Sequence, residues 1–156
     1  MKIEGHTHTE LCPHGSKEKT EKMIQRAIAL GFKEYCITEH APLPVGFHNV
    51  YQGSAEGIEE ASLTWDQLEE YFALGEHLKQ KYQGILHISL GFEVDYIPGF
   101  EEQIRAFLDE YGTRTQQNIL SVHFMQGKDA AFWCLDLSAA ECKRGYAVLL
   151  PNPQSL

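Results

Sequence analysis

The chain has 156 residues, of which 43% are hydrophobic and 22% are charged, values that suit one folded domain and exclude a disordered chain. A formal net charge of −9 argues against nucleic-acid binding driven by charge. There is no apolar run of about 18 residues, and the start MKIEGHTHTELC lacks an apolar signal core. We therefore expect neither a membrane segment nor secretion.

The first segment of the chain predicts a strand followed by a helix. Residues 3–8 form a short strand candidate that ends in a polar turn. Residues 16–30 place apolar side chains at helical spacing. Ser16 is the expected N-terminal cap of this helix, and Gly31 fits its C-terminal end.

A buried strand and a long loop come next. Residues 35–38, with the sequence YCIT, are typical of a buried strand. Residues 41–63 show neither a helical nor a strand period, and loops of that length in compact domains often carry function. Thr64 and Gln67 have the spacing of a capping box, which predicts that a helix begins there.

The later elements repeat the alternation of strands and helices. The helix after the capping box ends at Gly84, residues 85–94 form the clearest strand, residues 99–111 a further helix, and residues 119–124 a fourth strand. Strands that alternate with helices predict an α/β fold with parallel strands and right-handed crossovers. The stretch after Ser138 shows no clean period.

The cysteines indicate a reducing compartment. They are Cys12, Cys36, Cys134 and Cys142. No two of them have CxxC spacing, which favours free thiols and a cytoplasmic protein. Cys12 is close in sequence to His8 and His14, so a thiolate metal ligand is an open alternative.

Four histidines and one glutamate gather where predicted strands end. His6 and His8 alternate on a strand, so both side chains point to one face. His40, Glu93 and His123 each lie near the C-terminal end of a different strand. Those ends emerge on one face of a parallel fold, so we expect these side chains to meet. Imidazoles with a carboxylate suit Zn, Mn or Fe.

Other polar residues are assigned from their surroundings. His14 stands in a CPHG loop and is a further metal-ligand candidate, with a simple loop residue as the alternative. Glu39, next to His40, is expected to orient a ligand rather than to bind metal itself. His48 and His77 are expected to be exposed, and His87 is expected to have a structural role.

An ordered set of short motifs resembles a known superfamily. The motifs are HTH at 6–8, CPHG at 12–15, TEHAP at 38–42, GFEVDY at 91–96 and SVHF at 121–124. Together they resemble the PHP (polymerase and histidinol phosphatase) superfamily, most closely its histidinol-phosphate phosphatases. The resemblance runs over about residues 2–138.

The resemblance implies a fold, a metal centre and a reaction. The fold would be the N-terminal part of a distorted (β/α)7 TIM-like barrel, with the domain at residues 1–138 and a divergent tail at residues 139–156. Two or three divalent metals would be held by His6, His8, His14, His40, Glu93 and His123. Glu93 would bridge metals, and a metal-activated water would hydrolyse L-histidinol phosphate to L-histidinol and phosphate, a step of histidine biosynthesis.

The chain also departs from the superfamily pattern. Members usually carry a late Asp-x-His motif, whereas no histidine follows His123 here, and a closed barrel needs about 200–250 residues. We therefore expect a truncated chain, whose two open sheet edges favour a homodimer. None of the arginines can be assigned to substrate: Arg26, Arg105, Arg114 and Arg144.

Two alternative functions stay open. The first is an inactive metal-binding fragment or pseudoenzyme, which would bind metal without turnover. The second is a PHP phosphoesterase with another substrate, such as a proofreading exonuclease module. That reading predicts a basic groove or a polymerase extension, and the sequence shows neither.

Overall fold

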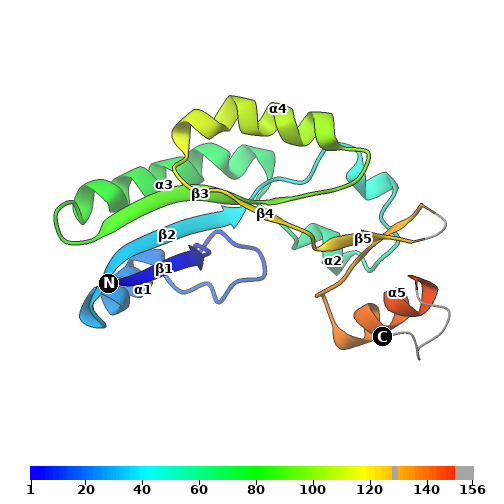
Figure 1. The fold of residues 1–156 in the computed structure, drawn as a ribbon, viewed down its shortest axis with the longest axis horizontal. Helices are drawn as coiled ribbons and strands as arrows, with labels where there is room; N and C mark the ends of the chain where they lie inside the picture. The colour runs from blue at the N-terminus through cyan, green and yellow to red at the C-terminus, as the bar shows by residue number, and fades with distance from the viewer. Residues whose placement is uncertain (128–129, 150–156) are drawn as a thin grey trace.

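The computed structural model, which describes residues 1–127 and 130–149, contains a curled four-stranded sheet (Figure 1). Its strands are β1 (Lys2–Thr7), β2 (Phe32–His40), β3 (His87–Asp95) and β4 (Ile119–Ser121), in that spatial order. Each strand pairs in parallel with the strand before it. The parallel pairing confirms the α/β fold that the alternation of strands and helices predicts, and the curled sheet agrees with the partial TIM-like barrel that the resemblance implies.

Three helices connect these strands and share one apolar core with them. They are α1 (Thr20–Ala29), α3 (Leu68–Lys81) and α4 (Glu101–Tyr111), and Figure 1 shows α3 and α4 lying over the sheet. Buried side chains from these helices meet those of β2 and β3, including Ile24, Ile37, Tyr71, Phe72, Leu90, Phe92 and Phe107. The buried Tyr71 hydroxyl donates to the backbone oxygens of Ile37 and Gly91, which satisfies its polar end.

Gly91 permits a close approach of two chain segments. A Cβ at this position would lie 1.3 Å from the backbone oxygen of Gln117, so no larger residue fits there. The Gln117 side chain reaches further and donates to the backbone oxygen of Gly5 over 3.0 Å. It also accepts from the Cys36 thiol over 3.1 Å. Hydrogen bonds of Gln117 therefore connect the segment before β4 to both β1 and β2.

A second, smaller core lies beyond the ends of the strands. It is built on Phe47 in the short helix η1 (Phe47–Asn49) and on the hairpin of β5 (Phe124–Gln126) and β6 (Phe132–Cys134). The Phe47 ring packs 4.8 Å from the Phe124 ring and 5.3 Å from the Phe132 ring, centroid to centroid. The remaining short helices are α2 (Glu56–Glu59), η2 (Trp65–Gln67) and η3 (Gly112–Arg114).

The fourth strand differs from the expected span of residues 119–124. β4 ends at Ser121, and the chain then turns into β5, which pairs antiparallel with β6. The cause is a side chain of another strand, because the backbone N–H of His123 donates to the Asp95 side chain over 2.9 Å instead of continuing the ladder. The turn brings His123 next to the end of β3.

The first helix also differs, because it begins at Thr20 and Ser16 does not cap it. The Thr20 backbone N–H and hydroxyl both donate to one oxygen of Glu10, over 2.7 and 2.5 Å. A carboxylate from the loop after β1 therefore takes the place of a local cap. The expected capping box of Thr64 and Gln67 is present.

The segment after Ser138, which shows no clean period in sequence, contains the helix α5 (Ala139–Leu149). The Tyr146 ring packs 5.5 Å from that of Trp133 on β6. The domain limit at residue 138 stays a prediction, and residues 150–156 of the predicted tail lie outside the described residues. Within the described ranges, no helix is both long and apolar enough to cross a membrane.

Candidate metal centre

The first two histidines lie at the end of β1. His6 belongs to the strand and His8 follows it directly. Their Nε2 atoms are 3.0 Å apart. The alternation of a strand therefore brings both imidazoles to one point, as the HTH motif predicts.

Glu93, near the end of β3, lies at the centre of four imidazoles. Its Oε2 atom is 3.1 Å from His6 Nε2, 3.4 Å from His8 Nε2 and 3.4 Å from His40 Nδ1. Its Oε1 atom is 3.2 Å from His123 Nε2. Burial of this 5% exposed residue opposes ionisation, but the hydrogen bond from His123 and the nearby histidines lower the pKa of Glu93 to about 2. A buried carboxylate whose two oxygens contact different imidazoles can bridge two cations.

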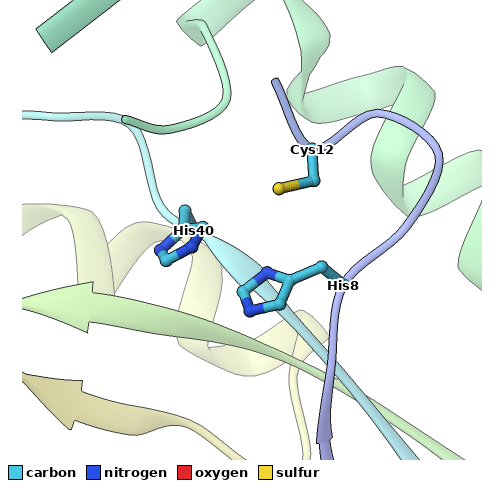
Figure 2. Close-up of side chains that lie close together, drawn as sticks. All are labelled: His8, Cys12 and His40. Carbon is cyan, nitrogen blue, oxygen red and sulfur yellow. The ribbon is translucent and has the colours of Figure 1, made fainter. Parts of the chain in front are cut away.

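The described side chains form three groups with the spacing of metal ligands. Within each group the ligand atoms lie within 4.8 Å of one another, and the groups are His6–His8–Glu93, His40–Glu93–His123 and His8–Cys12–His40. Figure 2 shows the third group, with the Cys12 sulfur and the two rings facing one space. Burial and the charge of Glu39 raise the pKa of the Cys12 thiol to about 11, so this sulfur stays protonated without a metal.

His14 lies beside these groups and is not a member of them. Its ring centroid is 4.9 Å from that of His40 and 6.5 Å from that of His8. Its Nδ1 atom donates to the backbone oxygen of Glu60 over 2.6 Å. That bond leaves Nε2 with its lone pair free for a ligand.

Two carboxylates orient the imidazoles from outside. Glu39 is fully buried, and its Oε1 atom accepts from His8 Nδ1 over 2.9 Å. Asp95 accepts from His123 Nδ1 over 3.0 Å and also from the His123 backbone N–H. Each bond fixes the tautomer that presents Nε2 to Glu93, which is the usual arrangement behind metal-binding histidines. Sequence reasoning missed this contact of Asp95, although its place two residues after Glu93 puts both on one strand face.

The two most buried histidines have opposite charge preferences. Burial and the neighbouring His8 lower the pKa of His40 to about 4, so its ring is neutral at physiological pH. Hydrogen bonds to Asp95 and Glu93 raise the pKa of His123 to about 10. His40 Nδ1 is buried yet makes no hydrogen bond to the described part of the chain. A neutral imidazole whose buried nitrogen makes no hydrogen bond but lies 3.4 Å from a Glu93 oxygen fits a cation better than it fits a proton.

A cavity of about 200 Å³ opens beside these residues. Its lining includes His14, His40, Asp95 and His123, together with residues of the segment before α3. Asp136, after β6, also lines it and lies 3.9 Å from His123 Nε2. Small molecules that reach this cavity would therefore touch the histidine groups directly.

The remaining histidines and the arginines lie elsewhere. His48 and His77 are exposed, as expected. His87 begins β3, at the opposite end of that strand from Glu93, and is exposed, with Ser89 Oγ 3.4 Å away. Four arginines are absent from the described cavity lining: Arg26, Arg105, Arg114 and Arg144.

The comparison with protein families identifies a matching domain. The model of the PHP domain matches residues 4–146 of this chain. The histidinol-phosphatase of Bacillus subtilis (strain 168) is 40% identical over 136 residues, which are 87% of this chain and 48% of that protein. The chain thus spans about half the length of this curated relative.

Two crystal structures have the same fold as the described chain. That of hisK from Listeria monocytogenes superposes with a TM-score of 0.87 and 45% identity, over 90% of this chain and 51% of that chain. Histidinol phosphate phosphatase from Lactococcus lactis subsp. lactis Il1403, in complex with zinc, L-histidinol and phosphate, has a TM-score of 0.63 and 27% identity. The latter match covers 80% of this chain and 41% of that chain.

Proposed function

This chain belongs to the PHP domain family, and on that basis we propose that it is a metal-dependent histidinol-phosphatase that hydrolyses L-histidinol phosphate to L-histidinol and phosphate. The observation that carries the proposal is the position of Glu93 between four imidazoles. The name of the Bacillus subtilis relative and the ligands of the Lactococcus lactis complex support this choice of substrate.

The proposed metal ligands follow the two groups that share Glu93. His6 and His8 with Glu93 would hold one cation, and His40 and His123 with Glu93 a second. His14, whose Nε2 is free, would serve a third. Imidazole and carboxylate donors suit Zn, Mn or Fe, so we propose two or three ions of these metals.

The metals would supply an acidified water and neutralise the phosphate oxygens. The residues of the chain hold and orient this centre. Glu39 accepts a hydrogen bond from Nδ1 of His8, and Asp95 accepts one from Nδ1 of His123. Nε2 of each ring therefore faces the centre. Glu93 is held ionised by its surroundings, as a bridging ligand must be.

The proposed setting is the cytoplasm. All the cysteines are free, as in a reducing compartment: Cys12, Cys36, Cys134 and Cys142. The proposed binding partner is a small phosphate monoester, and we propose that the protein binds neither nucleic acid nor a membrane. An acidic chain of net charge −9 fits such a substrate when metal ions neutralise the phosphate.

The direct test is phosphate release from L-histidinol phosphate by the purified 156-residue chain with Mn, Zn or Fe added. We expect turnover that falls by at least about 100-fold in His8→Ala, because that variant removes a ligand of the centre. His77→Ala, which removes an exposed imidazole on α3, is the matched control and should keep full activity. Equal rates in both variants would contradict the assignment.

A second candidate function is metal binding without turnover. It is favoured by the cavity lining, because the described lining residues include no Lys or Arg to bind a phosphate oxygen. Bound metal, lost in His8→Ala, together with a folded chain that releases no phosphate would establish this alternative.

A further inference from the structure

One side chain crosses the face of the sheet that is turned away from the helices. The apolar core shared with the helices lies on the face that carries Ile37 of β2, and Cys36, its neighbour in the strand, points to the opposite, open face. Gln117, in the segment before β4, reaches over this open face. Its Oε1 atom accepts from the Cys36 thiol over 3.1 Å, and its Nε2 atom donates to the backbone oxygen of Gly5 in β1 over 3.0 Å. The amide therefore links the β4 side of the sheet to β1, the other edge.

A β-bulge directs His6 to the same open face. Two residues of β1, Gly5 and His6, stand opposite the single residue Cys36 of β2. A continuous register would pair His6 with the next residue of β2, whose side chain faces the helices. The shift gives that partner to Thr7 instead, so His6 lies on the open face, where its Nε2 atom is 3.1 Å from Glu93 Oε2. The bulge is therefore a condition for this contact.

The Gln117 amide bonds to both strands of the bulge, and its backbone is fixed to β3. The Gln117 N–H donates to the backbone oxygen of Leu90 over 3.3 Å. Its own backbone oxygen occupies the space that a side chain at Gly91 would need. Gly91 lies two residues before Glu93 and on the same face of β3. A fixed point on the strand of Glu93 therefore holds the bulge in β1.

We propose that Gln117 is a positioning residue for the metal centre, which holds the bulge of β1 so that His6 reaches Glu93. The proposal rests on the metal ligands of the proposed function, and it adds a residue that is not itself a ligand. His6, His8 and Glu93 are called the β1 group below. Without the amide, the backbone before His6 loses a hydrogen bond that aims its ring, so the β1 group should bind its cation less tightly.

The other metal group that shares Glu93 does not depend on this link. It consists of His40, Glu93 and His123. His40 pairs in register with Glu93 in a regular part of the β2–β3 ladder, and His123 is held by hydrogen bonds to Asp95. Loss of the Gln117 amide should therefore weaken the cation site of the β1 group and spare this one, whereas a general loss of the fold would weaken both.

The first measurement needs no metal. Hydrogen exchange, followed by mass spectrometry, reports on the backbone of residues 3–8 in the metal-free chain. We expect this segment to exchange about fivefold faster in Gln117→Leu, the usual effect of one lost hydrogen bond. Gln117→Asn, whose amide is one methylene shorter, should behave in the same way. Gln116→Leu is the matched control, because the Gln116 amide bonds to Lys79 and to β3, and it should keep the wild-type rate in residues 3–8. Equal rates in wild type and all variants would overturn the proposal.

The second measurement follows both metal groups. Zn is titrated against a chelator that changes colour on binding metal, and His6→Ala and His123→Ala identify the binding step of each group. We expect Gln117→Leu to weaken only the step that His6→Ala removes, again about fivefold. Equal weakening of both steps, or of neither, would refute the positioning role.

Phosphate release from L-histidinol phosphate separates this proposal from the proposed function. Turnover by the wild type, with unchanged Zn affinities in Gln117→Leu, refutes the positioning role and leaves the phosphatase intact. Selective weakening of the His6 step in a chain that shows no turnover supports the positioning role and refutes the phosphatase.

Discussion

At the scale of single residues, Glu39 decides which nitrogen of His8 is available. Its Oε1 atom accepts from His8 Nδ1, and its Oε2 atom accepts from the Thr9 backbone N–H and hydroxyl, each over 2.7 Å. Burial opposes the charge, but the hydrogen bonds from His8 and Thr9 outweigh it and lower the pKa of Glu39. The carboxylate therefore needs both oxygens as acceptors, and an amide cannot replace it.

We predict that Glu39→Gln weakens metal binding about 10- to 100-fold, because an amide nitrogen in place of one oxygen would face a hydrogen-bond donor and release the ring of His8. Competition with a chelator that changes colour on binding metal measures this affinity. Glu34→Gln, on the same strand but away from the histidines, is the control and should keep the wild-type affinity. Unchanged affinity in Glu39→Gln would show that His8 needs no orienting partner.

Sequence periodicity was sufficient to predict that some of these residues meet, but not others. The alternation of a strand predicts that His6 and His8 share a face, and the same rule places Asp95 beside Glu93. No local pattern links His14 to Glu60, because the two are 46 residues apart and meet only through a loop. Contacts of this kind depend on the assembled fold.

At the scale of elements, the start of α1 depends on a distant carboxylate. The sequence predicts a helix from Ser16, but the helix begins at Thr20, where Glu10 accepts two hydrogen bonds. Similarly, the fourth strand ends early because Asp95 accepts from the backbone of His123. In both cases a side chain from another segment overrides the local preference, so the existence of an element was predictable and its limit was not.

Removing the Glu10 charge should destabilise the protein. We predict that Glu10→Gln lowers the free energy of unfolding by about 1 kcal/mol at neutral pH, the usual effect of losing a helix cap. Hydrogen bonds from Thr20 and Lys19 lower the Glu10 pKa below its ordinary value of 4.5, against the effect of burial. Its contribution is therefore complete above that value and is lost as the pH falls through the lower, folded-state pKa.

Urea unfolding at neutral pH and at several values below pH 4.5 measures this difference. The difference in free energy of unfolding between wild type and Glu10→Gln should become smaller at acidic pH. Ser16→Ala is the control, because Ser16 does not cap the helix, and it should change the free energy of unfolding by less than about 0.5 kcal/mol. A larger loss in Ser16→Ala than in Glu10→Gln would contradict this account of the helix start.

At the scale of the whole molecule, β1 and β4 are the edges of the sheet, and within the described residues each pairs with one other strand of it. Apolar side chains lie on both, with Ile3 49% and Leu120 67% exposed. Open edges of this kind pair readily with another chain. We therefore propose that two copies associate through these strands.

Light scattering should give a mass that rises toward twice the monomer as the concentration increases. Leu120→Lys should shift the protein toward the monomer, because a charged side chain on an edge strand opposes pairing. Val45→Lys is the control, since Val45 is 71% exposed but lies in the loop after β2. A wild-type monomer at the highest concentration would refute the association.

The spatial order of the sheet, β1-β2-β3-β4, is also the order in which a ribosome makes the strands. Each strand after β1 leaves the ribosome when its neighbour is already present, so the sheet can grow by addition at one edge during synthesis. Of the residues around Glu93, His123 is translated last and closes the group. The order of synthesis therefore allows the first three strands to form before the last of the proposed metal ligands is made.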